Sequence, residues 1–354
     1  MPVQHIRSYS FSLIVRAVLP LAFFAVSTSH LKAQEDGGFY KDKQLRVVVG
    51  SAAGSGYDLI ARLVWRFVPN HLPGKPTVII QNLPGAGSVQ MANQVANSAP
   101  RDGTVIGAPI NGMPTAPLLQ PEGARFDAST LIWIGAAARE QQVAIASSTA
   151  PAISLPELYS KEILVGATTA GTTMVDFPAV AGAFLGLKFK VVRGYEGTAQ
   201  IITAIEAGEL QGIGGLGWSS AKILAGKQIA DGRMKVIAQY GFQRHPELID
   251  VPLIYDLAKS EEDRLAMRLT FARQDYDRAY FLPPGVPPTR VETLRRAFDA
   301  TMKDQAFLVE ARRMQLDVDP MTGERVDELI HEVLRTPKPI VERVRAAIDG
   351  TSSR

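Results

Sequence analysis

Three short loops of small residues are the parts of this 354-residue chain whose composition suits binding chemistry. Residues 51–58 read SAAGSGYD, residues 83–88 read LPGAGS and residues 168–173 read TTAGTT, and none of these loops contains lysine or arginine. Each follows a short β-rich run and precedes a helical pattern, which is where ligands bind in open α/β sheets. Backbone N–H groups in such loops, with the N-terminus of the following helix, favour an anion. The loops therefore predict a pocket that holds a small anion through peptide nitrogens and hydroxyl groups.

The candidate ligand-binding residues are the small, polar and aromatic residues of these loops and of the turns beside them. They are Ser55, Gly56, Tyr57, Asp58, Gly85, Ala86, Gly87, Ala170, Gly171, Thr172, Thr173, Asp176, Tyr195 and Trp218. Some of them also have a structural interpretation. Asp58 precedes an apolar run with helical spacing and could cap that helix. Asp176 could be a first-turn helix acid, and Gly85 and Gly87 could simply form a turn.

Three of these candidates are aromatic. Tyr57 lies directly before Asp58 and shows no core periodicity, so ligand contact and exposure to solvent both remain open. Tyr195 and Trp218 each follow a glycine and could stack on the apolar body of a ligand. The alternative for both is a place in the apolar core.

The sequence lacks the residue patterns that catalysis or metal binding would need. The chain has no cysteine, and His71, His245 and His331 show neither metal-ligand spacing nor a triad pattern. Residues 212–217 read GIGGLG, which matches a dinucleotide-binding pattern, but they follow a short polar stretch rather than a buried first strand. Residues 50–54 read GSAAG, with serine at the second position, whereas a G-x-S-x-G nucleophile elbow has its serine at the third. We therefore expect no catalytic residue, no metal and no cofactor.

The first 33 residues have the features of a secretory signal peptide. Arg7 and Arg16 precede an apolar run over residues 17–26, and a small residue, Ala33, ends the segment. The apolar run is far shorter than the roughly 20 residues that cross a bilayer. Cleavage near Ala33 would remove three of the 38 basic residues and none of the 35 acidic ones, which leaves 35 of each. This balance argues against nucleic-acid binding, which needs a clustered basic surface.

The mature sequence alternates β-rich runs with helical patterns. Strands are expected at residues 45–49, 78–80, 105–108, 163–165, 189–192 and 234–238, and the C-terminal part is expected to be helical. Strand–helix alternation predicts βαβ units and parallel sheets. Because the pattern restarts in the middle of the chain, we expect two α/β lobes.

Several segments together resemble the Bordetella uptake gene family, whose members are the periplasmic receptors of tripartite tricarboxylate transporters. They are GSGYDLIAR (54–62), NLPGAGS (82–88), APRDGT (99–104), the tyrosine–glycine turn at 195–197 with the helix end at 207–209, and PPGVP (283–287). The similarity runs over nearly the whole mature chain, in order and with plausible spacing.

The resemblance implies an α/β fold of two hinge-linked lobes, the Venus-flytrap arrangement of type II-like periplasmic binding proteins. Lobe 1 would comprise residues 34–140 plus 275–354, and lobe 2 residues 141–274. Family members typically hold carboxylates through backbone amides, hydroxyls and ordered water rather than through an arginine clamp. We therefore expect a monomeric periplasmic receptor that captures a small organic acid for the membrane permease subunits of such a transporter.

The chain departs from the family pattern at two places that affect the ligand. Ser55 and Tyr57 replace a common glycine and threonine, and Met-Val-Asp at 174–176 replaces a common Ser-His pair. An acidic Asp176 near the cleft would repel a polycarboxylate unless it caps its helix or pairs with a base, which disfavours a citrate-like ligand.

Two other functions remain open. An exported, hydrolase-like enzyme would use the same cleft, but it would need a nucleophile–base pair or a metal cluster, and the sequence supplies neither. A receptor that feeds a signalling partner has the same sequence features as one that feeds a transporter.

Overall fold

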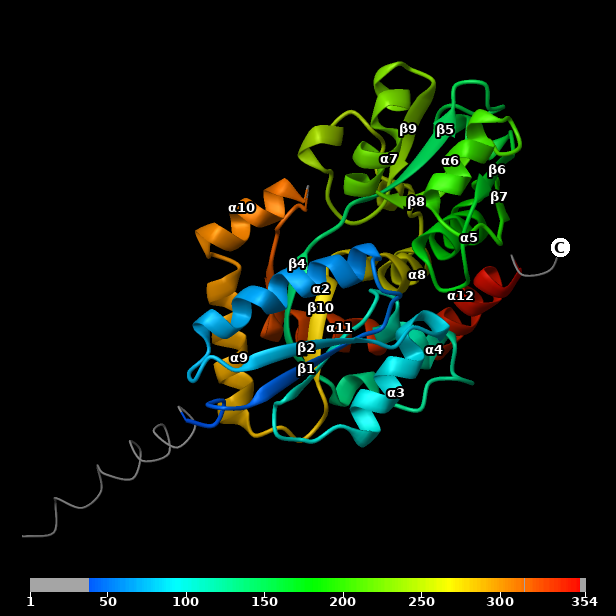
Figure 1. The fold of residues 1–354 in the computed structure, drawn as a ribbon. Coiled ribbons are helices and arrows are strands. Elements are labelled where there is room, and N and C mark those ends of the chain that lie inside the picture. The colour runs from blue at the N-terminus through cyan, green and yellow to red at the C-terminus, as the bar shows by residue number, and fades with distance from the viewer. Residues whose placement is uncertain (1–37, 315, 351–354) are drawn as a thin grey trace, which may run out of the picture.

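The structure is a computed structural model that describes residues 38–314 and 316–350 (Figure 1). The predicted signal peptide and its cleavage point lie outside the described residues. None of the helices in these two ranges combines the length and the apolar character that crossing a bilayer requires.

The first of two sheets has six strands in the order β11-β4-β10-β3-β1-β2. Its strands are β1 (Gln44–Val49), β2 (Thr77–Asn82), β3 (Val105–Ala108), β4 (Ile132–Ala138), β10 (Asp277–Leu282) and β11 (Met321–Thr322). β1 pairs in parallel with β2 and β3, and β10 runs antiparallel between β3 and β4. The valines of β1 are almost entirely buried, as expected for a parallel strand covered on both faces.

The second sheet has five strands in the order β7-β6-β8-β5-β9. Its strands are β5 (Gln142–Ser147), β6 (Ile163–Gly166), β7 (Phe189–Val192), β8 (Gly212–Gly217) and β9 (Met234–Gln239). β6 pairs in parallel with β7 and β8, and β5 runs antiparallel to β8 and β9. Two mixed sheets with helices between their strands confirm the predicted two-lobed α/β fold class.

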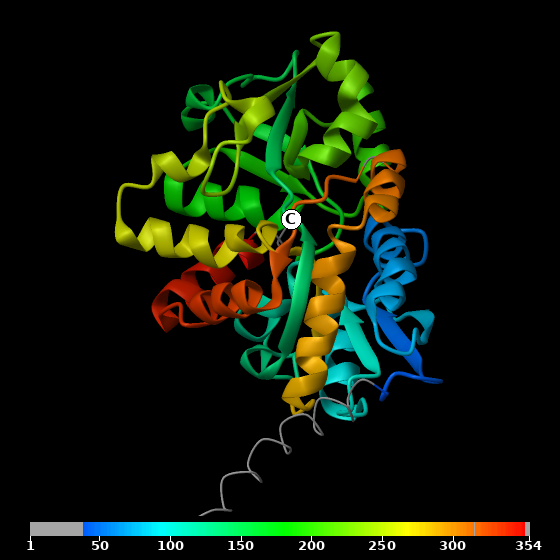
Figure 2. The same ribbon diagram turned by 90° about the vertical axis from the view of Figure 1, so that its left-hand side faces the viewer.

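Helices cover both sheets (Figures 1 and 2). They are α2 (Gly56–Phe67), α3 (Val89–Ser98), α4 (Ala116–Leu119), α5 (Thr173–Leu185), α6 (Thr198–Glu206), α7 (Trp218–Ala230), α8 (Glu261–Phe271), α9 (Pro288–Thr301), α10 (Gln305–Arg313), α11 (Gly323–Leu334) and α12 (Lys338–Gly350). Short 3-10 turns that matter for the site are η2 (Ala86–Ser88), η3 (Met113–Thr115) and η8 (Ala272–Gln274).

The glycine-rich segment at 212–217 is strand β8 itself and not a strand-to-helix turn. Its glycines allow α5 to pack closely on the sheet. A Cβ atom added to Gly214 would lie 2.6 Å from the ring of Pro178, and one added to Gly215 would lie 2.3 Å from the carbonyl oxygen of Thr173. The glycines therefore serve helix–sheet packing.

Two segments that pass between the sheets lie side by side. One is residues 139–141, between β4 and β5, and the other contains η8 and leads into β10. The N–H of Glu140 donates to the carbonyl oxygen of Gln274 (3.0 Å), and the N–H of Gln142 donates to the Gln274 side chain (3.1 Å). These bonds hold the two crossing segments together.

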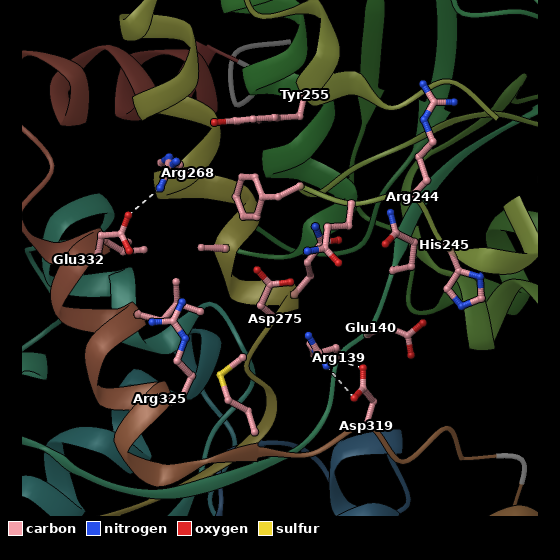
Figure 3. Close-up of a pocket in the computed structure, with 18 of the residues that line it drawn as sticks. Arg139, Glu140, Arg244, His245, Tyr255, Arg268, Asp275, Asp319, Arg325 and Glu332 are labelled. Carbon is pink, nitrogen blue, oxygen red and sulfur yellow. Dashed lines mark hydrogen bonds and ion pairs between the residues drawn. The ribbon is translucent and has the colours of Figure 1, made fainter. Parts of the chain in front are cut away.

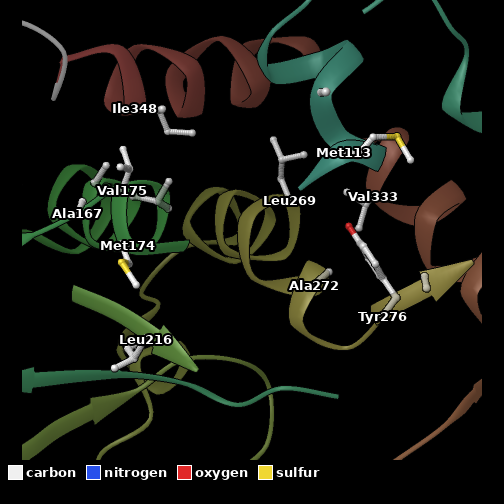
Figure 4. Close-up of a cluster of buried hydrophobic side chains, with 14 of the residues drawn as sticks. Met113, Ala167, Met174, Val175, Leu216, Leu269, Ala272, Tyr276, Val333 and Ile348 are labelled. Atoms are coloured by element: carbon white, nitrogen blue, oxygen red, sulfur yellow. The ribbon is translucent and has the colours of Figure 1, made fainter. Parts of the chain in front are cut away.

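The C-terminal helices connect both parts of the molecule. α11 packs on β4 of the first sheet, whereas α12 packs on α5 and α8 beside the second sheet. One apolar cluster is continuous across them, with Ile348 of α12, Val175 of α5, Leu269 of α8 and Met113 of η3 (Figure 4).

Gly107 of β3 offers a test of how tightly the first sheet is packed. A Cβ atom there would lie 2.3 Å from the ring of Phe281, which is fully buried and packs against Trp133. We predict that Gly107→Ala lowers the free energy of unfolding by about 1–3 kcal/mol, because the ring has no room to move. Urea denaturation would measure this change.

The control is Gly226→Ala in α7, where no atom lies within 4 Å of an added Cβ. Alanine there should raise the free energy of unfolding by about 0.5–1 kcal/mol, because it favours the helix. Equal effects of the two substitutions would contradict the prediction.

Candidate functional site

The loops singled out in the sequence lie at the carboxyl ends of parallel strands, and the two sheets turn these ends toward each other. The segment after β3 meets the loop after β6: a Cβ atom added to Gly112 would lie 3.0 Å from the carbonyl oxygen of Gly171. Loops from both sheets therefore come into contact at this point, where neither backbone carries a side chain.

A small cavity of about 10 Å³ lies at this contact. It is lined by Gly87, Gly112, Thr115, Ala116, Leu119, Gln120, Gly171, Asp176 and Arg273. Three of the predicted site residues, Gly87, Gly171 and Asp176, thus come together although they are far apart in the chain. The volume is about that of a single water probe, so the loops are closed against each other.

Asp176 forms a buried ion pair with Arg273, which the sequence analysis did not single out. Oδ2 of Asp176 lies 2.8 Å from Nη1 of Arg273, and the two side chains are 3% and 2% exposed. The same Nη1 donates to the carbonyl oxygen of Gly171 (3.3 Å), and the guanidinium lies over the ring of Phe177. Burial raises the pKa of the Asp176 carboxyl, and the charge of Arg273 opposes that rise. The acid therefore has the basic partner that its place near a cleft requires.

The second loop has an unusual backbone. Four consecutive residues, 85–88, have positive φ angles of 142°, 45°, 63° and 74°. The loop is fixed by Ser88, whose buried hydroxyl donates to the carbonyl oxygen of Gly50 (2.9 Å) and accepts from the N–H of Ile110 (3.0 Å). Ser88 thereby ties together the ends of β1, β2 and β3.

In the first loop, Ser55 rather than Asp58 caps the helix. The Ser55 hydroxyl accepts from the N–H of Asp58 (3.3 Å) and shares a hydrogen bond with the hydroxyl of Ser51 (2.7 Å). Gly56 begins helix α2 and is exposed. The helix is thus capped by the residue that departs from the family pattern.

Asp58 tethers the first loop to the end of β2, from which the second loop starts. Its buried carboxylate accepts from the N–H of Gly54 (2.8 Å), from Nε of Arg62 (3.0 Å) and from the side-chain amide of Asn82 (2.8 Å). Burial alone would raise the pKa of Asp58, but these three donors together hold it below its ordinary value. The carboxylate is thus used for anchoring both loops.

Tyr57 is bound to the start of β10. Its hydroxyl donates to Oδ1 of Asp277 (2.7 Å), and the guanidinium of Arg278 lies 3.8 Å above its ring. Arg278 also pairs with Oδ2 of Asp277 (2.8 Å). Burial, more than the charge of Asp277, raises the pKa of the Tyr57 hydroxyl. The tyrosine therefore connects α2 to the crossing segment.

The remaining candidates lie around the small cavity or away from it. The hydroxyls of Thr172 and Thr173 donate to the carbonyl oxygens of Thr169 (2.9 Å) and Gly215 (2.8 Å). Gly85 and Ala86 belong to the second loop, and Ala170 is exposed beside Gly171. Tyr195 is half-buried against the apolar cluster, and the indole N–H of Trp218 donates to Glu247 (2.7 Å).

A much larger cavity, of about 1060 Å³, lies at the crossing segments (Figure 3). Of the predicted residues only Trp218 lines it, and two ion pairs join charged residues of its walls. Arg139 pairs with Asp319 (2.7 Å), and Arg268 of α8 pairs with Glu332 of α11 (2.6 Å). The uncharged loops therefore converge on the small cavity and not on this one.

Metal binding finds no support in the described ranges. No group of three or more histidine, aspartate or glutamate side chains there is placed to hold a metal ion.

Two α/β units that are joined by adjacent crossing segments and bring uncharged loops together define the class of two-lobed solute-binding proteins. The fold is similar to that of a TctC solute-binding protein from Polaromonas, with 18% identity, a TM-score of 0.65 and coverage of 86% of this chain and 99% of that one. It is also similar to MatC from Rhodopseudomonas palustris with bound malate, with 18% identity, a TM-score of 0.61 and coverage of 84% and 99%.

The family described as the tripartite tricarboxylate transporter family receptor matches residues 60–345, and the chain belongs to this family. A UPF0065 protein of Bordetella pertussis is 24% identical over 94% of this chain and 98% of its own length. These matches confirm the resemblance that the loop sequences indicated.

Asp275 lies on the wall of the large cavity, in the crossing segment that leads into β10. The effect of its burial on the free energy of unfolding can be tested by changing the pH. Burial raises the pKa of Asp275 to about 6, although Arg139 and Arg325 partly offset this. The folded chain therefore binds a proton between about pH 4 and pH 6 that the unfolded chain, with a pKa of about 3.9, lacks. It follows that Asp275 lowers the free energy of unfolding progressively as the pH rises through this range.

We predict that Asp275→Asn raises the free energy of unfolding by about 2–3 kcal/mol at pH 7, the equivalent of about two pKa units, and changes it little at pH 4. Urea denaturation at the two pH values would measure this. Asp250→Asn is the matched control, because it removes the charge of an exposed acid and not that of a buried one. A gain of equal size at both pH values would show that burial of the carboxylate is not the cause.

Proposed function

We propose that this chain is a periplasmic receptor that captures a small carboxylate and delivers it unchanged to the membrane permease subunits of a tripartite tricarboxylate-type transporter. Membership of the receptor family supports the receptor role. The basic and apolar features of residues 1–33 support export and cleavage near Ala33. The malate bound to MatC, a protein of similar fold, supports an organic acid as ligand.

The observation that carries the proposal is the meeting of uncharged loops from two sheets at Gly112 and Gly171. Peptide N–H groups at the carboxyl ends of strands suit an anion. The cavity between them is too small for a carboxylate in the closed arrangement, so a ligand enters when the loops separate. The loops then close around the ligand instead of onto each other, and a ligand that binds best to this closed, occupied form shifts the population toward it. A permease would recognise this occupied form.

We infer binding without catalysis. A nucleophile would need a base within hydrogen-bond reach. The loop hydroxyls are instead bonded elsewhere: Thr172 and Thr173 donate to backbone carbonyls, and Ser55 pairs with Ser51. This supports a receptor over an exported hydrolase. Genes for permease subunits beside the gene of this chain would favour transport over signalling.

We further propose that the lobes are residues 34–140 plus 275–354 and residues 141–274, that they move about the two crossing segments, and that the receptor acts as a monomer. The paired backbones of Glu140 and Gln274 support this hinge.

Screening the mature protein by thermal shift against a panel of carboxylates, sugars and peptides tests the proposed ligand class. A carboxylate at 100 times its dissociation constant should add about 2.7 kcal/mol to the free energy of unfolding and visibly raise the melting temperature. Stabilisation by a sugar or a peptide, with none by any small organic acid, would refute the carboxylate assignment.

Gly171→Leu tests the place of the ligand. Gly171 has a φ of 79°, and an added Cβ would lie 2.8 Å from Nε2 of Gln120, so leucine would hold the loops apart. We predict that binding falls at least tenfold while the protein still folds, as measured by calorimetry and circular dichroism.

Gly186→Leu is the matched control, because Gly186 has a φ of 76° in the same lobe and no atom within 4 Å of an added Cβ. Leucine at either position strains the backbone by about 1–2 kcal/mol, but only Gly171→Leu should lose affinity. Unchanged affinity of Gly171→Leu would remove this loop from the site.

A further inference from the structure

Arg273 is almost completely buried, yet only one of its three guanidinium nitrogens is hydrogen-bonded within the described residues. Nη1 serves both Asp176 and the carbonyl oxygen of Gly171. Nε and Nη2 have no partner among the described residues, and neither does Oδ1 of Asp176. The ion pair therefore keeps two donor nitrogens and one acceptor oxygen available.

Such groups are expensive to leave unpaired. A buried polar group without a partner lowers the stability of the fold, and it does so more strongly when it is charged. A network that is only partly satisfied in the protein alone is thus completed by something else. The place of the pair shows where this partner would lie, because Arg273 and Asp176 both line the small cavity with Gly87, Gly112 and Gly171.

The two free nitrogens form one edge of the guanidinium. Nε–H and the adjacent Nη2–H point the same way and match the two oxygens of a carboxylate, which makes the bidentate arrangement that arginine favours. The opposite side of the group is already occupied by Asp176. A carboxylate on the free edge would thus lie close to the second oxygen of Asp176. When Asp176 is ionised, this oxygen can accept a hydrogen bond but cannot donate one.

We propose that Arg273 and Asp176 determine the specificity of the cleft: Arg273 binds the carboxylate of the ligand, and Oδ1 of Asp176 accepts a hydrogen bond from a hydroxyl or ammonium group on the neighbouring carbon. The ligand is then a small 2-hydroxy or 2-amino acid. This inference rests on the proposed function and narrows its ligand class.

Charge supports the same class. Arg273 and Asp176 together are neutral, and the loops around them carry no lysine or arginine. One carboxylate adds a single negative charge to this buried region, and a 2-amino acid adds none. Each further carboxylate would add a negative charge beside Asp176, while Arg273 already holds the first carboxylate, and this is costly in a buried site.

Pairs of ligands that differ only in the donor test this on the unaltered mature protein. The pairs are L-lactate with propionate, L-alanine with propionate, and L-malate with succinate, measured by calorimetry. In at least one pair the acid with the donor should bind about ten- to 100-fold more tightly, because a hydrogen bond to a charged group is worth about that much. The lactate and alanine arms distinguish a hydroxyl from an ammonium group.

Variants test the two side chains separately. Arg273→Lys keeps the positive charge but loses the two-nitrogen edge, so affinity for every carboxylate of the panel should fall at least tenfold. Asp176→Ala removes the acceptor oxygens and should erase the preference within each pair, while the acid without the donor binds no more weakly. Arg264→Lys, at an exposed arginine, is the control and should change neither affinity nor preference.

The outcomes are distinguishable. If no carboxylate binds the unaltered protein, the proposed function fails and this inference fails with it. If carboxylates bind but the members of each pair bind equally, the receptor function stands and this inference is wrong. Circular dichroism checks the fold of each variant, and where a variant does not fold, the ligand pairs alone decide.

Discussion

The backbone pairing of the two crossing segments is the constraint on which the rest of the structure depends. The hydrogen bonds from residues 140 and 142 to Gln274 keep the segments adjacent, although more than 130 positions separate them in the chain. Because these segments join the sheets at the carboxyl ends of β1, β3 and β6, those ends must face each other. The loops that follow the strands then meet without any side chain in between, at Gly112 and Gly171. The site is a product of this placement more than of any single loop.

Much of the fold could be predicted from the sequence, because the information was local. The strands at 45–49, 105–108 and 163–165 are runs of apolar and β-branched residues, and each was found close to its expected position. Strand β8 was missed, since a run of glycines disfavours a strand. Its sequence reflects the close packing of α5, which no local pattern contains. The antiparallel strands β4, β5 and β10, which carry the crossing segments, were likewise not predicted.

The candidate site was predicted only in part, because some of its residues are marked by local sequence patterns and others are not. Glycines at the ends of parallel strands pointed to Gly87 and Gly171, which do line the small cavity. Arg273 was missed because it lies 97 positions from Asp176 and outside every loop considered. Residues 271–276 read FARQDY, an even mixture of polar and apolar residues, so no local pattern marked this arginine as buried. Tyr57 and Asp58 were chosen for their place in the first loop, but both are engaged in holding loops and strands together.

The C-terminal helices add a third connection between the halves of the molecule. α11 lies on the first sheet, α12 lies on α5 and α8, and residues 335–337 pass from one side to the other. The side chain of Arg345 in α12 also donates to the carbonyl oxygen of Leu118, beyond β3. Two adjacent strands alone would let the halves twist about each other as well as swing apart. In the proposed opening, a third attachment at a distance from them would leave essentially one rotation free, and each opening would return the two walls of the cleft to the same register.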